Sequence, residues 1–396
     1  MTNFLGQLLP PGIEQAELEQ VIQQYFSSSR AATPDEVTYP GHETEYALKL
    51  TYEDGALVAI TEGPRLARGD LDALTERITQ ELIAQGEERI GCAVLFSSVP
   101  VEGAFSYRDA LQIIPAPPDA PRPPFQLGEH PFLLEFRFPS SPNWTIRNFR
   151  RLLRARELEL ILSALLEFGI SSISPISRHR WVLTNPDDLG NWQTRYLQEM
   201  YPWRGERGEL DEFTAIAGLS ELLRVDAAVY YSRTGIGADR RLELPGNLED
   251  LLDKIFALPS PARDRFLRAC FWFRHARKIY LDSRSAAYTA VISAIETLMP
   301  PQRGSGLCER CGRSMGPGPT QQFADFVERY ASGSGLSAGE RKRIYAIRSA
   351  LSHGGTLLHS DRSGWSPALT QSNIQEREDI DTAWRLVRAI LVNWGQ

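Results

Sequence analysis

The sequence contains few cysteines and no long apolar segment. Its 396 residues include four cysteines, which are too few for a disulfide scaffold. No apolar run approaches the ~18 residues that a membrane-spanning helix needs. The N-terminal residues Met1-Thr2-Asn3-Phe4 also lack the basic and apolar regions of a secretory signal. These absences predict a cytoplasmic protein with no membrane partner.

The composition is that of a globular protein. Apolar residues make up 42% of the chain, charged residues 23% and aromatic residues 10%. These proportions exclude a disordered tail, a collagen-like chain and a pure coiled coil. At roughly 150 residues per domain, two or three domains are expected. The sequence has no internal repeat and no phosphate-binding glycine loop.

The net charge of -7 is divided unevenly along the chain. From Asn247 to the C-terminus there are 20 basic and 15 acidic residues, whereas the first 246 residues hold 23 basic and 35 acidic ones. A mildly basic C-terminal part fits a domain that binds a polyanion. An excess of this size is also common in domains that bind none, so both interpretations stay open.

Residues 1–246 predict a mixed α/β domain of unknown role, with a proline-rich segment at 115–124 where it would split. Helical spacing and alternation predict its elements. The predicted helices are 13–25, 71–85 and 146–168, and the predicted β segments are a hairpin over 44–61 and strands over 90–97, 131–138, 171–183 and 225–231. Arginines gather at the start of the third helix, where they fit either contact with RNA backbone or a solvated helix face.

Residues 247–396 predict an all-α bundle, so the fold class is an α+β N-terminal domain followed by helices. The expected helices are about 260–281, 283–299, 320–330, 337–354 and 374–394, with an insert at 302–319. Ser260 before Pro261 predicts the N-cap of the first of these helices. Ser337 and Glu340 predict a capping box at the start of the fourth.

The fourth of these helices reads IYAIRSALSHGG from Ile344 to Gly355. This stretch resembles the signature of the Apea-like HEPN group, in which an arginine and a histidine four to six residues apart lie near the end of a bundle helix. The segment AYTAVISAIETLMP resembles the second helix of that group, with Glu296 at the place of its glutamate. The resemblance covers about Leu248 to Trp394 and none of the first half.

The resemblance implies a helical domain that dimerises and cleaves RNA without a metal, as in a toxin or phage-defence effector. It assigns catalysis to Arg348 and His353. Cleavage that depends on a ribose 2′-hydroxyl would fail on DNA. Ser349 stands where active members often have Asn, Asp or His. The non-catalytic alternative is therefore a HEPN module for dimerisation or for nucleotide or RNA binding.

Helix geometry is consistent with a site shared by two chains. Ile344, Ile347 and Leu351 lie within about 60° of one another and predict a buried stripe. His353 lies ~140° around the helix and ~7.5 Å along it from Arg348. One helix cannot close both residues around one phosphate unless it frays at Gly354 or a second chain contributes, and a two-fold pairing of this helix would supply that contribution.

The chemistry of the side chains suits RNA cleavage. Histidine is the side chain suited to proton transfer near neutral pH, so His353 can take a proton from a ribose 2′-hydroxyl, and Arg348 can hold the scissile phosphate. The further candidates are Ser349, Ser352, Tyr345 and Glu296 in supporting roles and Arg341 in substrate binding. Structural explanations compete, because a histidine in the last turn stabilises the helix dipole and an arginine beside an apolar stripe can simply extend to solvent.

Cys308 and Cys311 form a CxxCG motif, which has the shape of one half of a zinc knuckle. A structural zinc would need two more ligands, from His275, His359 or a second chain. A reducible cysteine pair and a pair with no special role are the other interpretations. A thioredoxin-like context is absent from the sequence around the motif.

Overall fold

The chain forms two compact units. The computed structural model describes residues 3–9, 13–26, 31–40, 45–67, 69–83, 88–117, 130–172, 181–183, 194–196, 208–233, 241–300, 318–363 and 371–394. Unit 1 comprises Met1–Gly91, Phe136–Arg154 and Glu209–Glu212, and unit 2 comprises Cys92–Glu135, Ala155–Gly208 and Phe213–Gln396. Within the described ranges, no helix is both long and apolar enough to cross a membrane.

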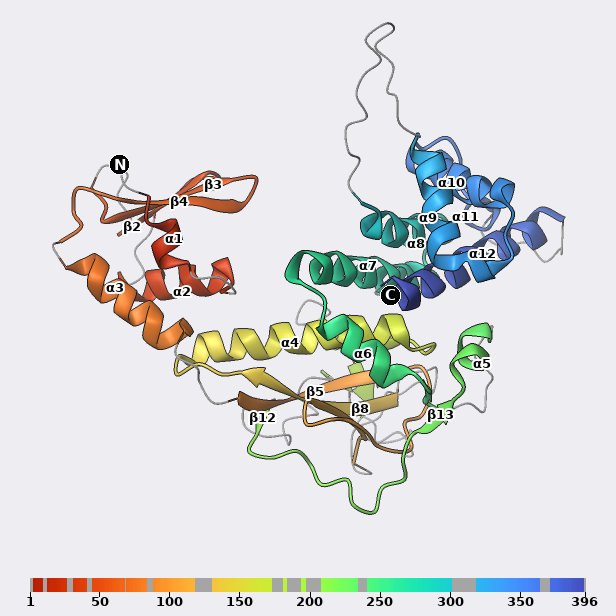
Figure 1. Ribbon diagram of the computed structural model, residues 1–396, viewed down its shortest axis with the longest axis horizontal. Helices are drawn as coiled ribbons and strands as arrows, with labels where there is room; N and C mark the ends of the chain where they lie inside the picture. The colour runs from red at the N-terminus through yellow and green to blue at the C-terminus, as the bar shows by residue number, and fades with distance from the viewer. Residues whose placement is uncertain are drawn as a thin grey trace, which may run out of the picture. The chain divides into compact units, whose positions relative to one another are not determined.

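Unit 1 contains a four-stranded antiparallel sheet with the order β1-β2-β3-β4 (Figure 1). The strands are β1 (Ala31–Ala32), β2 (Glu36–Tyr39), β3 (Leu48–Glu53) and β4 (Ala56–Glu62). The hairpin predicted over 44–61 is confirmed as β3 and β4. Asp54 and Gly55 turn the chain with φ values of 50° and 79°, the left-handed conformation that a two-residue turn of this kind needs.

Helices cover the apolar side chains of this sheet. They are α1 (Leu5–Leu8), α2 (Gln15–Tyr25), α3 (Asp70–Ile78) with a π-helical turn at Thr79–Ile83, and the first half of α4 (Trp144–Leu165). The three- and four-residue spacing of Leu18, Val21 and Ile22 on α2 places all three in one core with Leu50 and Ile60 of the sheet. The helices predicted over 13–25, 71–85 and 146–168 are therefore confirmed.

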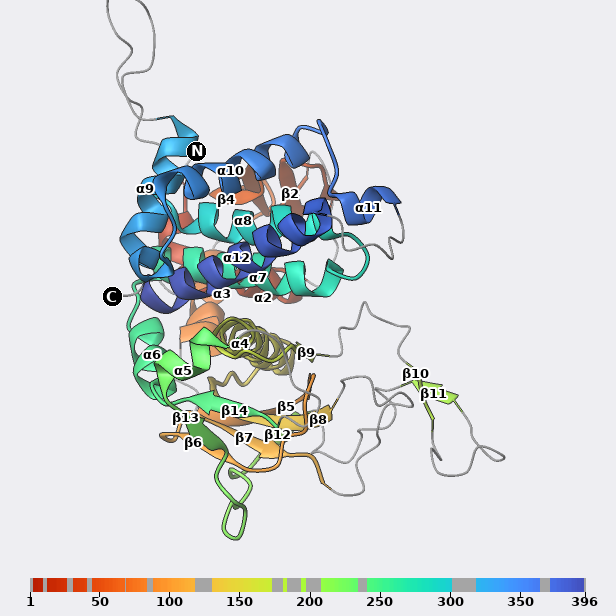
Figure 2. The same ribbon diagram turned by 90° about the vertical axis from the view of Figure 1, so that its right-hand side faces the viewer.

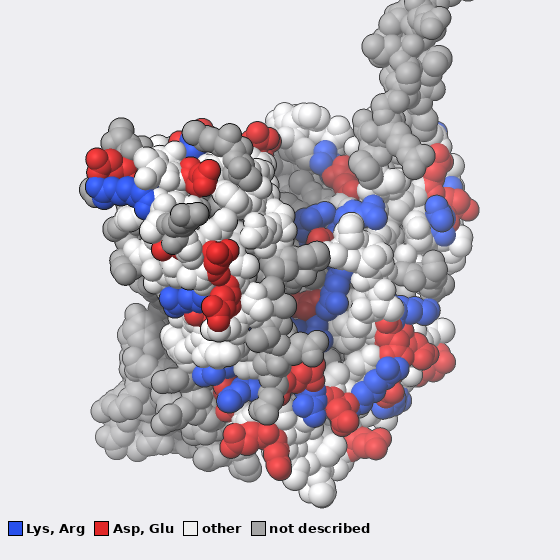
Figure 3. All heavy atoms as spheres, turned by 60° about the vertical axis from the view of Figure 1, so that its left-hand side comes forward, with Lys and Arg blue, Asp and Glu red and all other residues white. Residues whose placement is uncertain are grey.

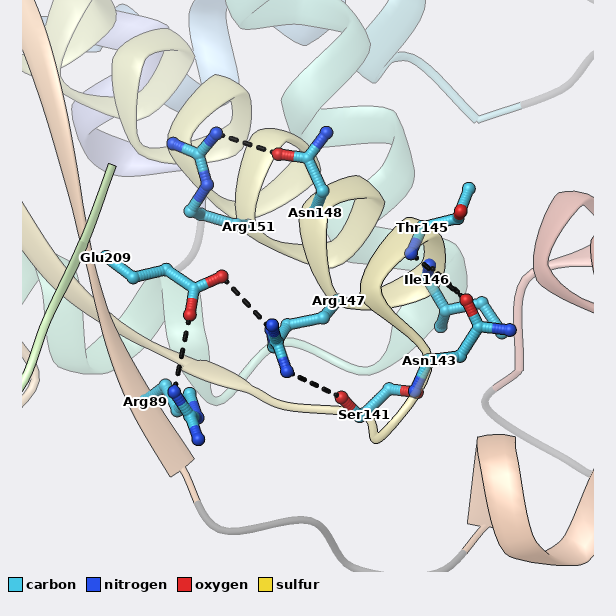
Figure 4. Close-up of polar contacts among 9 residues, drawn as sticks. All are labelled: Arg89, Ser141, Asn143, Thr145, Ile146, Arg147, Asn148, Arg151 and Glu209. Carbon is cyan, nitrogen blue, oxygen red and sulfur yellow. Dashed lines mark hydrogen bonds and ion pairs between the residues drawn. The ribbon is translucent and has the colours of Figure 1, made fainter. Parts of the chain in front are cut away.

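Arginines at the start of α4 are held by carboxylates of the same unit (Figure 4). Arg147 Nε donates to Glu209 Oε1 at 3.1 Å, and Arg89 reaches the other oxygen of Glu209 at 3.5 Å. Arg150 donates from Nε and Nη2 to the two oxygens of the buried Glu17 at 2.9 and 2.6 Å. Such bidentate pairs favour one fixed geometry, so this part of the arginine cluster serves the fold of unit 1.

A second sheet has the strand order β12-β5-β8-β7-β6, with β9 paired to β5. Its strands are β5 (Glu88–Ser97), β6 (Phe105–Tyr107), β7 (Leu111–Pro115), β8 (His130–Pro139), β9 (Ile170–Ser172) and β12 (Glu209–Leu210). Five consecutive residues of β8, Phe132 to Phe136, are buried, which shows that both faces of this central strand are covered. The strands predicted over 90–97 and 131–138 are confirmed as β5 and β8.

Two predicted strands in the first 246 residues need correction. The segment 171–183 is not one strand, because β9 ends at Ser172 and β10 (Trp181–Leu183) pairs separately with β11 (Thr194–Tyr196). Residues 225–231 are also not a strand. They contain the end of β13 (Leu223–Val225), which pairs with β14 (Glu243–Pro245), and most of helix α5 (Ala227–Ser232). Asp226 starts that helix by accepting the N–H of Val229 at 3.1 Å.

The C-terminal part of unit 2 is helical, as predicted (Figures 1 and 2). Its helices are α6 (Leu248–Phe256), α7 (Ser260–Ile279), α8 (Arg284–Leu298), α9 (Pro319–Ala331), α10 (Ala338–Ser352), α11 (His359–Ser363) and α12 (Gln371–Asn393). The protein is thus mixed α/β with helices toward its C-terminus. One detail is corrected: Pro259 is the N-cap of α7, and Ser260 is already its first helical residue, without a side-chain cap bond.

The apolar faces of these helices agree with the spacing in the sequence. Tyr288, Val291 and Ile295 on α8 and Val387 on α12 are all at most 2% exposed. The helices α7 and α8 form a hairpin, and α12 packs against α7, α8 and α9. The core of this region is therefore built from faces that the 3.6-residue period identifies.

Candidate functional site

The helix α10, which carries the Arg–His motif, has clear start and stop signals. The predicted capping box is confirmed: the Glu340 N–H donates to Ser337 Oγ at 3.3 Å, and the Ser337 N–H donates to Glu340 Oε2 at 2.8 Å. At the other end Gly354 has φ 69° and donates to the Leu351 carbonyl. The positive φ suits glycine and ends the helix directly after His353.

The face of α10 is less buried than its sequence predicts. Ile344 is 3% exposed, and its carbonyl accepts the Tyr288 hydroxyl of α8 at 3.1 Å. Ile347 and Leu351 are only partly buried. The prediction of a buried stripe is wrong for these two residues, because spacing identifies an apolar face but not how far its neighbours cover it.

Arg348 is joined to α8 by an ion pair. Its Nη2 donates to Glu296 Oε2 at 2.7 Å, and the two side chains are 24% and 25% exposed. Tyr345, one turn earlier on α10, lies beside this pair, since the guanidinium carbon of Arg348 is 5.9 Å from the centre of the Tyr345 ring. The Tyr345 ring also packs against Phe323 of α9, with the two ring centres 5.0 Å apart. Three of the predicted site residues, Arg348, Glu296 and Tyr345, are thus brought together.

The surroundings change the acidity of Tyr345. Partial burial raises the pKa of its phenol, and the nearby charge of Glu296 and a hydrogen bond with that carboxylate raise the pKa further, while Arg348 opposes them. The phenol is therefore neutral near pH 7 and can act as a hydrogen-bond donor at this position.

His353 lies apart from this group. It is exposed, is the C-cap residue of α10, and donates its backbone N–H to the Ser349 carbonyl at 3.1 Å. Among the described residues, none forms a hydrogen bond or ion pair with its imidazole. Ser349 is half-buried and Ser352 is exposed. Within one chain, Arg348 is held against α8 while His353 faces solvent.

Arg341 has structural partners near the start of α10. Its guanidinium forms an ion pair with Glu328 of α9 and donates to the Leu336 carbonyl at 2.6 Å. Arg341 is seven residues before Arg348, which corresponds to ~10 Å along the helix axis. These contacts join α9 to α10, and they keep Arg341 away from the Arg348–Glu296 pair.

The segment that follows His353 is held by two carboxylates that the sequence did not reveal. Asp361 accepts the N–H groups of Arg284 and Ser285 at 2.9 and 2.7 Å and the Ser283 hydroxyl at 2.8 Å. It thereby caps α8, and these hydrogen bonds lower its pKa although partial burial opposes them. Glu376 of α12 accepts the Ser360 hydroxyl in the same way at the start of α11. No local signal could identify these caps, because each acceptor is distant in sequence from its donors.

The surface charges do not form one continuous basic area on the face shown in Figure 3. Basic and acidic side chains are mixed over that face. Many arginines of the described chain are also paired with carboxylates, as Arg343 is with Asp379 at 2.7 Å. On this face an anionic ligand would therefore be recognised by individual arginines, not by a broad field.

The predicted zinc ligands Cys308 and Cys311 lie outside the described residues. The described residues include the cysteines Cys92 and Cys270, and both are buried thiols. Burial raises the pKa of the Cys270 thiol strongly. The described ranges contain no cluster of three or more His, Cys, Asp or Glu side chains suited to a metal.

Comparison with known proteins adds no family assignment. The sequence matches no protein-family model, and neither the curated proteins nor the solved structures include a significant match.

Proposed function

We propose that residues 247–396 form an HEPN-type, metal-independent endoribonuclease that works as a dimer in the cytoplasm. The observation that supports it best is the arrangement at the end of α10. Arg348 is held at 2.7 Å by Glu296, and His353 is exposed five residues later, just before the turn at Gly354. The resemblance of this segment to the Apea-like HEPN signature provides the reaction class.

Each side chain has a role that its surroundings allow. His353 is accessible and would remove the proton of a ribose 2′-hydroxyl, which then attacks the adjacent phosphorus. Arg348 would exchange its contact with Glu296 for the phosphate and stabilise the negative charge of the transition state. The bond from phosphorus to the 5′-oxygen breaks, and that oxygen takes a proton from solvent. The products would be a 2′,3′-cyclic phosphate and a 5′-hydroxyl, and DNA would not react because it has no 2′-hydroxyl.

A second copy of α10 would complete the site. Only Ile344 on this helix is fully buried, whereas Ile347 and Leu351 keep part of their apolar surface exposed. Pairing about a two-fold axis would bury that surface and place His353 of one protomer near Arg348 of the other. In such a protein the N-terminal region would sense a trigger, as in a toxin or phage-defence effector.

Incubation of the purified protein with structured RNA in the presence of a chelator tests this proposal. The expected products carry cyclic-phosphate ends, and loss of the general base in His353→Ala should slow cleavage by about 10²–10⁴-fold. His130→Ala, a histidine on β8, is the matched control and should cleave normally. Cleavage by His353→Ala at the wild-type rate would remove the catalytic assignment.

The alternative function is a non-catalytic HEPN module for dimerisation or for nucleotide or RNA binding. The specific observation in its favour is Ser349, half-buried beside Arg348, where active members of the group often carry another polar residue. Sedimentation analysis separates the two functions: if Arg348→Ala abolishes the dimer and wild-type protein cuts no RNA, the binding module is correct.

A structural zinc held by Cys308 and Cys311 is a separate part of the proposal. Elemental analysis of freshly purified protein should find zinc, and Cys308→Ser should remove it. A metal content near zero in the wild-type protein would exclude this ion.

A further inference from the structure

Two exposed aromatic side chains and a half-buried histidine form a stripe on α7. Phe271 and Trp272 are 41% and 38% exposed, and His275 stacks on Phe271 with ring planes 2° apart at 5.9 Å. Trp272 meets both neighbours edge to face, at 5.7 Å from Phe271 and 6.0 Å from His275. We call Phe271, Trp272 and His275 the aromatic stripe. Adjacent exposed rings of this size are uncommon on a surface that binds nothing.

Among the described residues of unit 2, α7 packs through other faces than the one that carries Phe271 and Trp272. A different face of the helix enters the core, where Phe266, Cys270 and Phe273 are at most 1% exposed. Another side of α7 faces α4, because Arg263 Nε donates to Glu157 at 2.6 Å and Arg274 pairs with Glu159. The aromatic stripe is therefore not needed to join α7 to its neighbours.

Basic residues lie at both ends of the aromatic stripe. Arg268 precedes Phe271 by three residues, and Lys278 follows His275 by three, so all five residues share one side of the helix over ~15 Å. Both basic residues are exposed. No described residue forms an ion pair or hydrogen bond with Arg268. The sequence of α7 contains five arginines and one lysine against a single acidic residue, Asp264.

This charge pattern favours a polyanion over a second copy of α7. A two-fold axis through the middle of the stripe would bring Arg268 of one copy close to Lys278 of the other, and like charges in contact disfavour such pairing. Single-stranded nucleic acid matches the pattern, because bases stack on aromatic rings while the phosphates on either side meet basic side chains.

We propose that the aromatic stripe binds single-stranded RNA, with bases stacked on Trp272 and Phe271 and phosphates held by Arg268 and Lys278. This inference rests on the proposed ribonuclease function and adds to it a second contact for the substrate, on α7 instead of α10. The chemistry of stacking makes the site tolerant of base sequence, since every base offers a flat face.

The test uses the full-length protein and a fluorescent 2′-O-methyl oligouridine of 12 nucleotides, followed by anisotropy. This RNA cannot be cleaved through its blocked 2′-hydroxyls, so binding is measured apart from catalysis. Trp272→Ala should weaken binding by about tenfold or more, and Trp272→Phe should restore most of the affinity. The matched control is Trp144→Ala, which removes a tryptophan of similar exposure, 46%, from unit 1 and should bind within twofold of wild type.

Salt dependence and two further results decide the proposal. Arg268→Gln should lower the slope of log affinity against log salt by about 0.7, the value for one phosphate contact on a single strand. If Trp272→Ala binds as tightly as wild type, or if it loses only self-association in sedimentation, the aromatic stripe is not an RNA site. Because this RNA cannot be cleaved, its binding is measured without the nuclease reaction, so failure of the nuclease proposal leaves this test unaffected.

Discussion

Two arginines of unit 2, Arg277 on α7 and Arg348 on α10, are held in opposite ways. Arg277 directs both terminal nitrogens at main-chain carbonyls in the last turn of α4 and just after it, where a helix has no internal donors left. The acceptors are the carbonyl oxygens of Ser163, Leu166, Glu167 and Phe168, at 3.0 to 3.3 Å. Arg348 donates instead to the Glu296 carboxylate, and about a quarter of its side chain is exposed.

The difference separates an arginine of the fold from one that can exchange its partner. Burial, and then the nearby charge of Arg388, lowers the pKa of Arg277 to about 9, so the guanidinium stays charged at pH 7 and keeps its carbonyl acceptors. Arg348 can exchange a carboxylate for a phosphate at small cost, because an ion pair at this exposure contributes only about 1 kcal/mol. The same residue type thus stabilises one helix end and is available for chemistry at another.

The largest effect on stability is expected from Arg277→Met. The substitution leaves several buried carbonyls without donors, and we expect the free energy of unfolding to fall by about 3 kcal/mol. Urea denaturation followed by circular dichroism measures the change. Arg268→Met, an exposed arginine on the same helix, is the matched control and should change stability by less than about 0.5 kcal/mol. Equal midpoints for the two variants would show that Arg277 is not a structural arginine.

Local patterns predicted most of the helices but not the contacts between them. Spacing identified α8 and α12 because long apolar faces repeat every three or four residues. It failed at α5, where Tyr230 and its apolar neighbours suggested a strand and the N-cap Asp226 was overlooked. An N-cap followed by a short apolar run is the signal that would have corrected this prediction.

In the candidate site, too, local sequence patterns predicted the helix but not its contacts with other helices. The sequence placed Glu296 among the supporting residues of the site without saying which residue it contacts, and in the structure it accepts a hydrogen bond from Arg348. Spacing alone could not choose, because Glu296 and Arg348 are 52 residues apart. The cap by Asp361 escaped prediction for the same reason: its donors on α8 lie 76 to 78 residues away.

Asp361→Ala tests whether the segment after His353 is held as firmly as the segment after α4. The variant removes the acceptor for two backbone N–H groups and one hydroxyl at the start of α8, so we expect a loss of about 2 kcal/mol. Asp282→Ala provides the control, since Asp282 is an exposed aspartate just before the same helix. Thermal melting of both variants gives the comparison, and a cap of no importance would leave the two melting temperatures equal.

The contribution of Asp361 should also depend on pH. Its pKa is lowered in the folded protein by hydrogen bonds from the start of α8, so the ionised carboxylate stabilises the folded state relative to the unfolded one. This stability is fully present above the ordinary aspartate pKa of about 4 and is lost as the pH falls through the lowered value. The difference in urea midpoint between wild type and Asp361→Ala should therefore be larger at pH 7 than at pH 3. A difference that is constant over this range would contradict the capping role.

The smallest effect on stability is expected from Glu296→Gln. An ion pair whose partners are about a quarter exposed should contribute no more than about 1 kcal/mol, in contrast to the contacts of Arg277. The clearer result is the pKa of Tyr345, which the charge of Glu296 raises and which should fall in the variant. Carbon-13 NMR of labelled tyrosine follows the titration, and Tyr345→Phe identifies the resonance.

Glu328→Gln is the matched control for this last measurement. Glu328 lies on α9 and pairs with Arg341, which is on α10 as Arg348 is. It should leave the titration of Tyr345 unchanged. If Glu296→Gln also leaves it unchanged, Glu296 does not face Tyr345 and Arg348 in solution. The proposed exchange of carboxylate for phosphate would then lose its starting state, and Arg348 would have to reach RNA from another arrangement of α10.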